Sequence, residues 1–319
     1  MTTYRIEGYF RLKSPLSHIG ETISNKSYLV QDRILQRDGE VEEVFCYSGN
    51  AWRGQLRDLC AAYMLERLGD ARVPLDTFHL LFSGGRIGGA QNTDIAQARR
   101  MRAAVPMLAL FGGGVGNQIM QGKMRVGNCY PICREAIPVL PYAVHAQAET
   151  IPYSACTMEK EHSRRDDAKI ENVRRHLAED PSALLLDGGN KKAAEKDGPA
   201  DQMRIGMELL TPGVTLHSWI VVEAASDVEL GALISGLHAF SAAPAIGGKV
   251  GIGYGLVDLT YSITSDGETR DLMQVRDGVS LLSTEAAQAK DAYDQHLRGL
   301  YDAMLESNQS EITALLGAS

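Results

Sequence analysis

Hydrophobic and charged residues alternate with period two along residues 4–13 of the 319-residue chain. The apolar positions include Ile6 and Phe10, and Arg5 and Arg11 are among the polar positions between them. This pattern predicts a strand with one buried face and one polar face. The Asp38-Gly39 pair predicts a hairpin within residues 33–45. Further strands are predicted at 122–133, 203–210, 215–224 and 256–263.

Two segments with helical spacing of apolar residues separate these strands. The first begins at Ser48 or Asn50, either of which can cap it, and the second covers 227–243. Without the insertions described next, the order is strand, helix, strand, strand, helix, strand. This is the split βαβ plan of ferredoxin-like and RNA-recognition domains. The predicted fold class is therefore α+β, with an RRM-like βαββαβ core.

The predicted core spans residues 1–265 and is interrupted twice. Residues 69–121 form an insertion with helical stretches and glycine-rich turns, and residues 145–202 form a densely charged insertion. Residues 266–319 contain four Lys and Arg against ten Asp and Glu, and they show helical spacing. We therefore expect an acidic helical tail after the core.

The composition narrows the classes of function. Hydrophobic residues make up 44% of the chain, no apolar run reaches the length of a membrane span, and the N-terminus lacks a secretion signal. Five scattered cysteines predict reduced thiols in a cytoplasmic protein, without a zinc site or other metal site. The net charge of −8 argues against nucleic-acid binding over the whole surface, but it allows a local basic groove.

Residues 247–255 read GGKVGIGYG, with five glycines in nine positions. Such a loop allows close approach to backbone N–H groups, while Lys249 adds a positive charge and Tyr254 an aromatic face. The loop therefore suits a phosphate-bearing ligand. Its spacing matches neither the Walker A loop nor a dinucleotide-binding fingerprint, so we expect no nucleotide cofactor.

Basic residues recur elsewhere at spacings that place them together. Arg53 and Arg57 are one helical turn apart near a helix N-terminus, where an anion would relieve their repulsion. Lys123 and Arg125 share one side of a predicted strand. Arg86 lies between two glycine pairs, and further arginines cluster at 164–165. The alternative for each is an ordinary solvated surface residue.

The order of these motifs resembles a known superfamily. A His-x-Gly loop after the first strand is followed by YSGNAWRGQLRDL at 47–59, LFGGGVGN at 110–117, GKMRV at 122–126, MELLTPGVTL at 207–216 and GGKVGIGYGLVDL at 247–259. This series resembles the RAMP superfamily. Within it, the series is most similar to the Cas-seven-type backbone subunits of CRISPR RNA-guided effector complexes, and among these to the type IV subunit.

The resemblance implies a subunit that polymerises along a CRISPR RNA as a helical filament. It would hold the sugar-phosphate backbone of the guide and leave the bases free to pair with a target nucleic acid. The implied partners are the guide RNA, further copies of the chain and other effector subunits, and the region 145–202 would supply a thumb. The expected RNA-binding residues are His18, Ser48, Asn50, Arg53, Arg57, Arg86, Lys123, Arg125, Arg164, Arg165, Gly247, Gly248, Lys249, Gly251, Gly253 and Tyr254.

Two other functions remain open at this stage. A RAMP-type endoribonuclease would need a positioned base such as His18, His145 or His162. A metabolic enzyme could bind a phosphorylated small molecule through the glycine loops, although the sequence shows no nucleophile–base pair. Type III relatives cut RNA with an aspartate after the first strand, whereas residues 18–31 contain Glu21 as their only acid. We therefore expect a binding protein and no catalytic residue.

Overall fold

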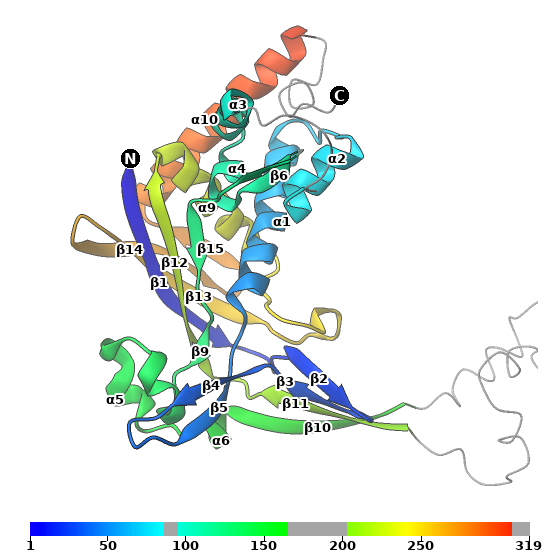
Figure 1. Ribbon diagram of the computed structural model, residues 1–319, viewed down its shortest axis with the longest axis vertical. Helices are drawn as coiled ribbons and strands as arrows, with labels where there is room; N and C mark the ends of the chain where they lie inside the picture. The colour runs from blue at the N-terminus through cyan, green and yellow to red at the C-terminus, as the bar shows by residue number, and fades with distance from the viewer. Residues whose placement is uncertain (86–94, 116, 165–202, 308–319) are drawn as a thin grey trace, which may run out of the picture.

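The computed structural model describes residues 1–85, 95–115, 117–164 and 203–307 (Figure 1). Its larger sheet is antiparallel, with strand order β15-β14-β13-β1-β12-β8 and with β9 beside β12. The strands are β1 (Thr2–Leu12), β8 (Met124–Val126), β9 (Tyr130–Pro131), β12 (Thr215–Ala225), β13 (Val257–Ser265), β14 (Glu268–Arg276) and β15 (Val279–Leu282).

The centre of this sheet has the predicted RRM-like plan. Along the chain the core elements are β1, α1 (Gly49–Arg67), β8, β12, α9 (Asp227–Phe240) and β13. In space the four strands lie in the order β13-β1-β12-β8, the 4-1-3-2 arrangement of a split βαβ fold. Helices α1 and α9 pack against each other beside the sheet. The expected α+β fold class is confirmed.

The alternation along β1 determines which face of the sheet is buried. Ile6 and Phe10 have no exposed surface, whereas Arg5 and Arg11 on the opposite face are exposed. Under the helices, the ring of Trp52 makes edge contacts with Phe10 and Phe240, with centroid distances of 5.2 Å and 5.1 Å. Its indole N–H donates to the hydroxyl of Tyr261 at 3.2 Å. An aromatic cluster therefore joins the two core helices to the sheet.

Local capping fixes where the two core helices begin. The Ser48 hydroxyl accepts from the Asn50 amide at 3.2 Å, so Ser48 is the cap of α1. Ser226 and Glu229 form a reciprocal capping box at the start of α9. Ser48, one of the two predicted caps, is thus the one used.

A second sheet has the strand order β10-β11-β3-β2 and lies at the bottom of Figure 1. Strands β10 and β11 form an antiparallel pair on either side of residues 165–202, which lie outside the described residues. The predicted insertion at 145–202 therefore begins with short helices and the first arm of a strand pair. The elements are β2 (Ile19–Ile23), β3 (Lys26–Leu29), α5 (His145–Ala148), α6 (Tyr153–Cys156), β10 (Thr157–Arg164) and β11 (Met203–Leu210).

The remaining insertions are built from short elements. The predicted hairpin around Gly39 is present, with a φ of +94° at this glycine. The hairpin strands are β4 (Gln31–Leu35) and β5 (Val41–Phe45). The described residues of the region 69–121 form helices, a turn and a small strand pair: α2 (Leu75–Phe78), the π-helical turn η1 (His79–Ser83), α3 (Ile95–Ala104), α4 (Pro106–Phe111), β6 (Gly113–Val115) and β7 (Gln118–Met120). After β9 follow the 3₁₀ turns η2 (Arg134–Val139) and η3 (Tyr142–Val144).

The C-terminal region differs in part from the expected helical tail. Strands β14 and β15 extend the main sheet, and the helix begins only at α10 (Thr284–Ser307). Helix α10 packs on α9 and reaches α1. The Asp294 carboxylate accepts from the Tyr63 hydroxyl at 2.6 Å and from the Lys290 ammonium at 2.9 Å. These bonds attach α10 to the core.

Candidate nucleic-acid interface

Three segments distant in sequence meet at one end of the main sheet: the loop after β1, the start of α1 and the glycine loop 247–255. The Gly248 amide donates to the Ser17 carbonyl at 2.6 Å, and the Gly255 amide donates to the Pro15 carbonyl at 2.8 Å. The side-chain amide of Gln55 on α1 donates to the Ala245 carbonyl at 2.8 Å. The first loop therefore holds the glycine loop directly, and α1 holds Ala245, two residues before the glycine loop begins.

His18 connects the first loop to the start of α1. Its Nε2 accepts from the Ser48 amide at 3.4 Å, and its ring lies against Tyr47 with a centroid distance of 5.0 Å. Burial lowers the pKa of His18. The imidazole is therefore neutral at pH 7, and its acceptor nitrogen is already in use.

The glycine loop owes its shape to close approaches that only glycine permits. A Cβ at Gly247, where φ is +78°, would lie 2.5 Å from the Ser17 carbonyl oxygen, and one at Gly255 would lie 1.9 Å from the Ile246 oxygen. Gly251 and Gly253, on and after the turn η4 (Val250–Ile252), face open space instead. The outer part of the loop is thus accessible to a ligand.

Lys249 lies at the exposed part of this loop, in the left-handed conformation with a φ of +60°. Within the described residues its ammonium group has no ion-pair or hydrogen-bond partner. Gly248, Gly251 and Gly253 are exposed beside it. The loop therefore presents an unpaired positive charge next to accessible backbone.

Tyr254 does not present the aromatic face that the sequence predicts. Its side chain is buried with Met207 and Leu209, and its hydroxyl lies 3.2 Å from Nε2 of His162 on β10. The Lys160 ammonium lies over its ring, 5.5 Å from the centroid. Tyr254 thus fixes the loop against β10 and β11, because its ring faces these strands instead of solvent.

Arg57 also differs from the expectation that it lies along an RNA. Its side chain is buried, and its guanidinium donates to the carbonyls of Phe111 at 2.9 Å, Gly112 at 3.1 Å and Leu80 at 3.3 Å. Arg53 donates to the same Phe111 carbonyl. Burial, and then the neighbouring Arg53, lowers the pKa of Arg57 to about 10. The two arginines hold the C-terminal end of α4 instead of facing an open groove.

Lys123, just before β8, and Arg125, on β8, both form ion pairs. The Lys123 ammonium lies 2.6 Å from the Glu229 carboxylate and donates to the Ala224 carbonyl at 2.9 Å. Arg125 pairs with Glu223 at 2.8 Å and is exposed. Their charges are therefore partly neutralised within the chain.

The other predicted residues divide between this end of the sheet and the undescribed regions. Asn50 is exposed in the first turn of α1, next to the cap Ser48. Arg164 is the last residue of β10, and Arg86 and Arg165 lie outside the described residues. The structure thus brings together His18, Ser48, Asn50, Gly247, Gly248, Lys249, Gly251 and Gly253.

Sequence reasoning missed the residues that support this site. The Ser17 hydroxyl is buried at the junction with Gly248 and has no hydrogen-bond partner among the described residues. Gln55 lies one helical turn after the buried Trp52, and its polar residue type alone marks it as a surface residue.

Within the described ranges, no group of three or more His, Cys, Asp or Glu side chains is arranged to hold a metal ion.

Comparison with known proteins yields a structural likeness alone. No family model and no curated protein matches the chain. Among solved structures, a chain of a Type IV-B CRISPR complex superposes with a TM-score of 0.53 over 82% of this chain and 90% of that chain, at 19% sequence identity. The two chains share a fold. In the described ranges, none of the helices combines the length and the hydrophobicity that a membrane-spanning helix needs.

Proposed function

We propose that this chain is the RNA-binding backbone subunit of a CRISPR RNA-guided effector complex. The supporting observation is the junction of the first loop, the start of α1 and the glycine loop, which presents Lys249 without a partner among the described residues. The shared fold with a chain of a Type IV-B CRISPR complex and the motif order of the sequence support the same proposal.

The chemistry of this junction suits a sugar-phosphate backbone more than bases. It offers a cation, the exposed amide side chain of Asn50 and accessible glycine backbone, which are groups that contact phosphate without reading sequence. Tyr254, the one aromatic residue in the glycine loop, is buried and thus not available to stack on a base. The guide would therefore be held regardless of its sequence, with its bases free.

Several copies would bind one guide side by side. Contacts between unlike surfaces of identical chains do not close on themselves and produce an open filament. In this proposal, the region 145–202, of which residues 165–202 lie outside the described residues, acts as the thumb between neighbouring copies. Further effector subunits would bind at the ends of such a filament, and the target nucleic acid would pair with the exposed guide bases.

Binding without cleavage is the proposed activity. The Nε2 atom of His18 already accepts a hydrogen bond, and His145 contacts the Leu140 carbonyl at 3.1 Å. Asp32, just after the first loop, accepts from Tyr130 at 2.7 Å and from Asn128 at 3.0 Å. These groups have partners within the protein, which favours structural roles over general base catalysis.

The direct test is co-expression with a CRISPR array, followed by purification and sequencing of the bound RNA. Guide-length RNA with evenly spaced nuclease protection is the expected result. Protein that purifies without RNA in the presence of its partner subunits would refute the proposal. Saturable binding of a phosphorylated small molecule would then favour the metabolic alternative.

Removing the charge of Lys249 tests the contribution of this residue to guide binding. Lys249→Gln is expected to weaken guide binding equally for all sequences and to reduce the salt dependence of log K by about 0.7, the value for one phosphate contact on a single strand. Arg298→Gln, which removes an exposed charge on α10, is the matched control. An unchanged salt dependence for Lys249→Gln would exclude the proposed contact.

A further inference from the structure

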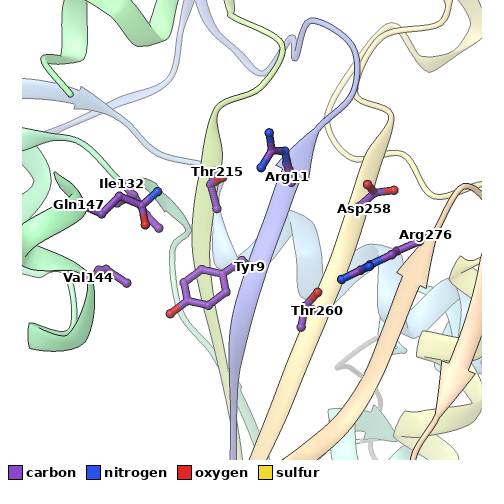
Figure 2. A pocket seen from close by; sticks show the side chains of 9 residues that line it. All are labelled: Tyr9, Arg11, Ile132, Val144, Gln147, Thr215, Asp258, Thr260 and Arg276. Atoms are coloured by element: carbon purple, nitrogen blue, oxygen red, sulfur yellow. The ribbon is translucent and has the colours of Figure 1, made fainter. Parts of the chain in front are cut away.

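The face of the main sheet opposite α1 and α9 carries a groove that the proposed guide contacts do not use. Figure 2 shows its floor, where β12, β1 and β13 carry Thr215, Tyr9 and Thr260, with Arg276 on the adjacent strand. Val144 and Gln147 form one wall. The hollow has a volume of about 510 Å³, within the range of ligand-binding pockets.

The groove is elongated. A second hollow of about 420 Å³ shares Arg11, Ile132, Gln147 and Thr215 with the first, and it continues to the turn at 211–213. Two adjoining hollows with common walls favour a chain-like ligand over a compact small molecule. The face is also accessible, because Arg11 and Arg276 are exposed and Tyr9 is half-buried.

The charges along the groove favour an anion. Neither Arg11 nor Arg276 has an ion-pair or hydrogen-bond partner within the described residues. Asp258, the acid in the lining, lies 3.5 Å from the Lys13 ammonium, which also lies 3.4 Å from Asp277. Arg11, Lys13 and Arg276 thus outnumber these two carboxylates, and the local charge is positive. Two unpaired guanidinium groups therefore lie on one face of a chain whose net charge is −8.

Tyr9 adds an aromatic surface beside Arg11 on the same strand. Its ring packs beside His217 with a centroid distance of 6.0 Å, and its hydroxyl has no partner among the described residues. Tyr9 and Arg11 are two residues apart on the same strand face, so their backbones are about 7 Å apart. A stacked base on Tyr9 and its phosphate on Arg11 fit that separation, and aromatic stacking beside cations is how single strands bind without sequence preference.

We infer that this groove binds a short stretch of single-stranded nucleic acid, with a base stacked on Tyr9 and phosphates on Arg11 and Arg276. The site is additional to the glycine-loop contacts and does not depend on the proposed function, because none of its residues belongs to those contacts. Single-stranded RNA and DNA share the recognised chemistry. The hydroxyl and amide groups of Thr215, Thr260 and Gln147 face the bound strand.

The test uses the full chain and a six-nucleotide single strand containing photoreactive 4-thiouridine, with mass-spectrometric mapping of the crosslink. The expected crosslink is on Tyr9 or on the adjacent residues of the groove. Crosslinks confined to residues 247–254 would overturn the groove site and leave the proposed guide contacts intact. Guide RNA failing to co-purify, with the Tyr9 crosslink retained, would refute the proposed function alone.

Binding measurements by fluorescence anisotropy give a second readout. Tyr9→Leu is expected to weaken binding of the six-nucleotide strand about tenfold, whereas binding of its abasic counterpart should not change. Arg11→Gln and Arg276→Gln should each lower the salt dependence of log K by about 0.7. The variants are made both in the wild-type chain and with Lys249→Gln, which removes the glycine-loop charge.

Arg298→Gln on α10 is the control for charge, and thermal melting confirms that each variant is folded. Equal affinity of wild type and all three groove variants would overturn the inference. Equal binding of the normal and abasic strands, or displacement of the strand by an acidic peptide at equal concentration, would also overturn it. Displacement by the peptide would show that the groove recognises negative charge on a protein partner instead of a nucleic acid.

Discussion

Arg57→Met is the substitution that separates a structural role of the helix α1 arginines from an RNA-binding role. Methionine keeps the apolar stem and much of the volume, but it removes the donors to the carbonyls of Leu80, Phe111 and Gly112. A hydrogen bond from a charged group contributes about 1.5–3 kcal/mol. The guanidinium also lies 5.2 Å from the centroid of the Phe111 ring, a contact worth about 1 kcal/mol.

Part of this loss is offset, because the variant no longer buries a cation beside Arg53. A net decrease of about 3 kcal/mol in the free energy of unfolding is therefore expected. For a protein of this size, a loss of 1 kcal/mol lowers the melting temperature by about 2 °C, so the expected decrease is about 6 °C. The assay is thermal unfolding followed by circular dichroism, with Arg298→Met as the surface control.

RNA binding is measured on the same samples at a temperature where all variants are folded. The structure predicts an unchanged salt dependence of binding for Arg57→Met. An unchanged melting temperature together with weaker guide binding would refute this reasoning. It would show that Arg57 leaves the α4 carbonyls and contacts RNA, as the sequence alone predicted.

Four further substitutions test the helix packing and two buried titratable groups. Burial alone would raise the pKa of Asp294, but hydrogen bonds from Lys290 and Tyr63 lower this pKa overall. Asp294→Asn should therefore destabilise the protein by about 2 kcal/mol at pH 7. In melting experiments at different pH values, the difference in stability from wild type should shrink below about pH 4. Gly231→Ala should lower the melting temperature, because its Cβ would lie 2.0 Å from the Ala289 carbonyl oxygen, whereas Gly54→Ala, with open space around it, should raise it slightly. Burial lowers the pKa of His217, so the stability of the protein should fall as the pH drops below about 6.5. His217→Gln should reduce that fall. If this variant has the same pH dependence as wild type, His217 is not responsible for the loss of stability.

The order of core elements was predictable because each has a local signal. Period-two alternation marks β1, and Ser48 marks the start of α1, so the RRM-like plan follows from the sequence. Strands β14 and β15 were missed, although Asp266-Gly267 and Asp277-Gly278 carry the dipeptide typical of tight hairpins. Their strand patterns are irregular, since half of β14 is exposed on both faces at the sheet periphery.

The candidate site was predictable only where backbone conformation determines it. The glycine loop follows from composition, because few other residues can adopt its positive φ angles. The burial of Arg57 and Tyr254 depends on carbonyls and strands far away in sequence, which no local pattern encodes. Arginine and tyrosine have both polar and apolar parts, so their residue type alone does not determine whether they face solvent.

The position of β1 has a consequence for how the chain folds. Ile6 pairs with Ile220 on one side and with Ile263 on the other, so β1 is completed only by strands that are synthesised much later than β1 itself. Until then its apolar face and both of its edges lack their native partners. Such long sequence separation slows folding and exposes the nascent strand to aggregation. In cells, the yield of this protein should therefore depend on chaperones that bind the exposed β1 segment while the rest of the chain is still being synthesised.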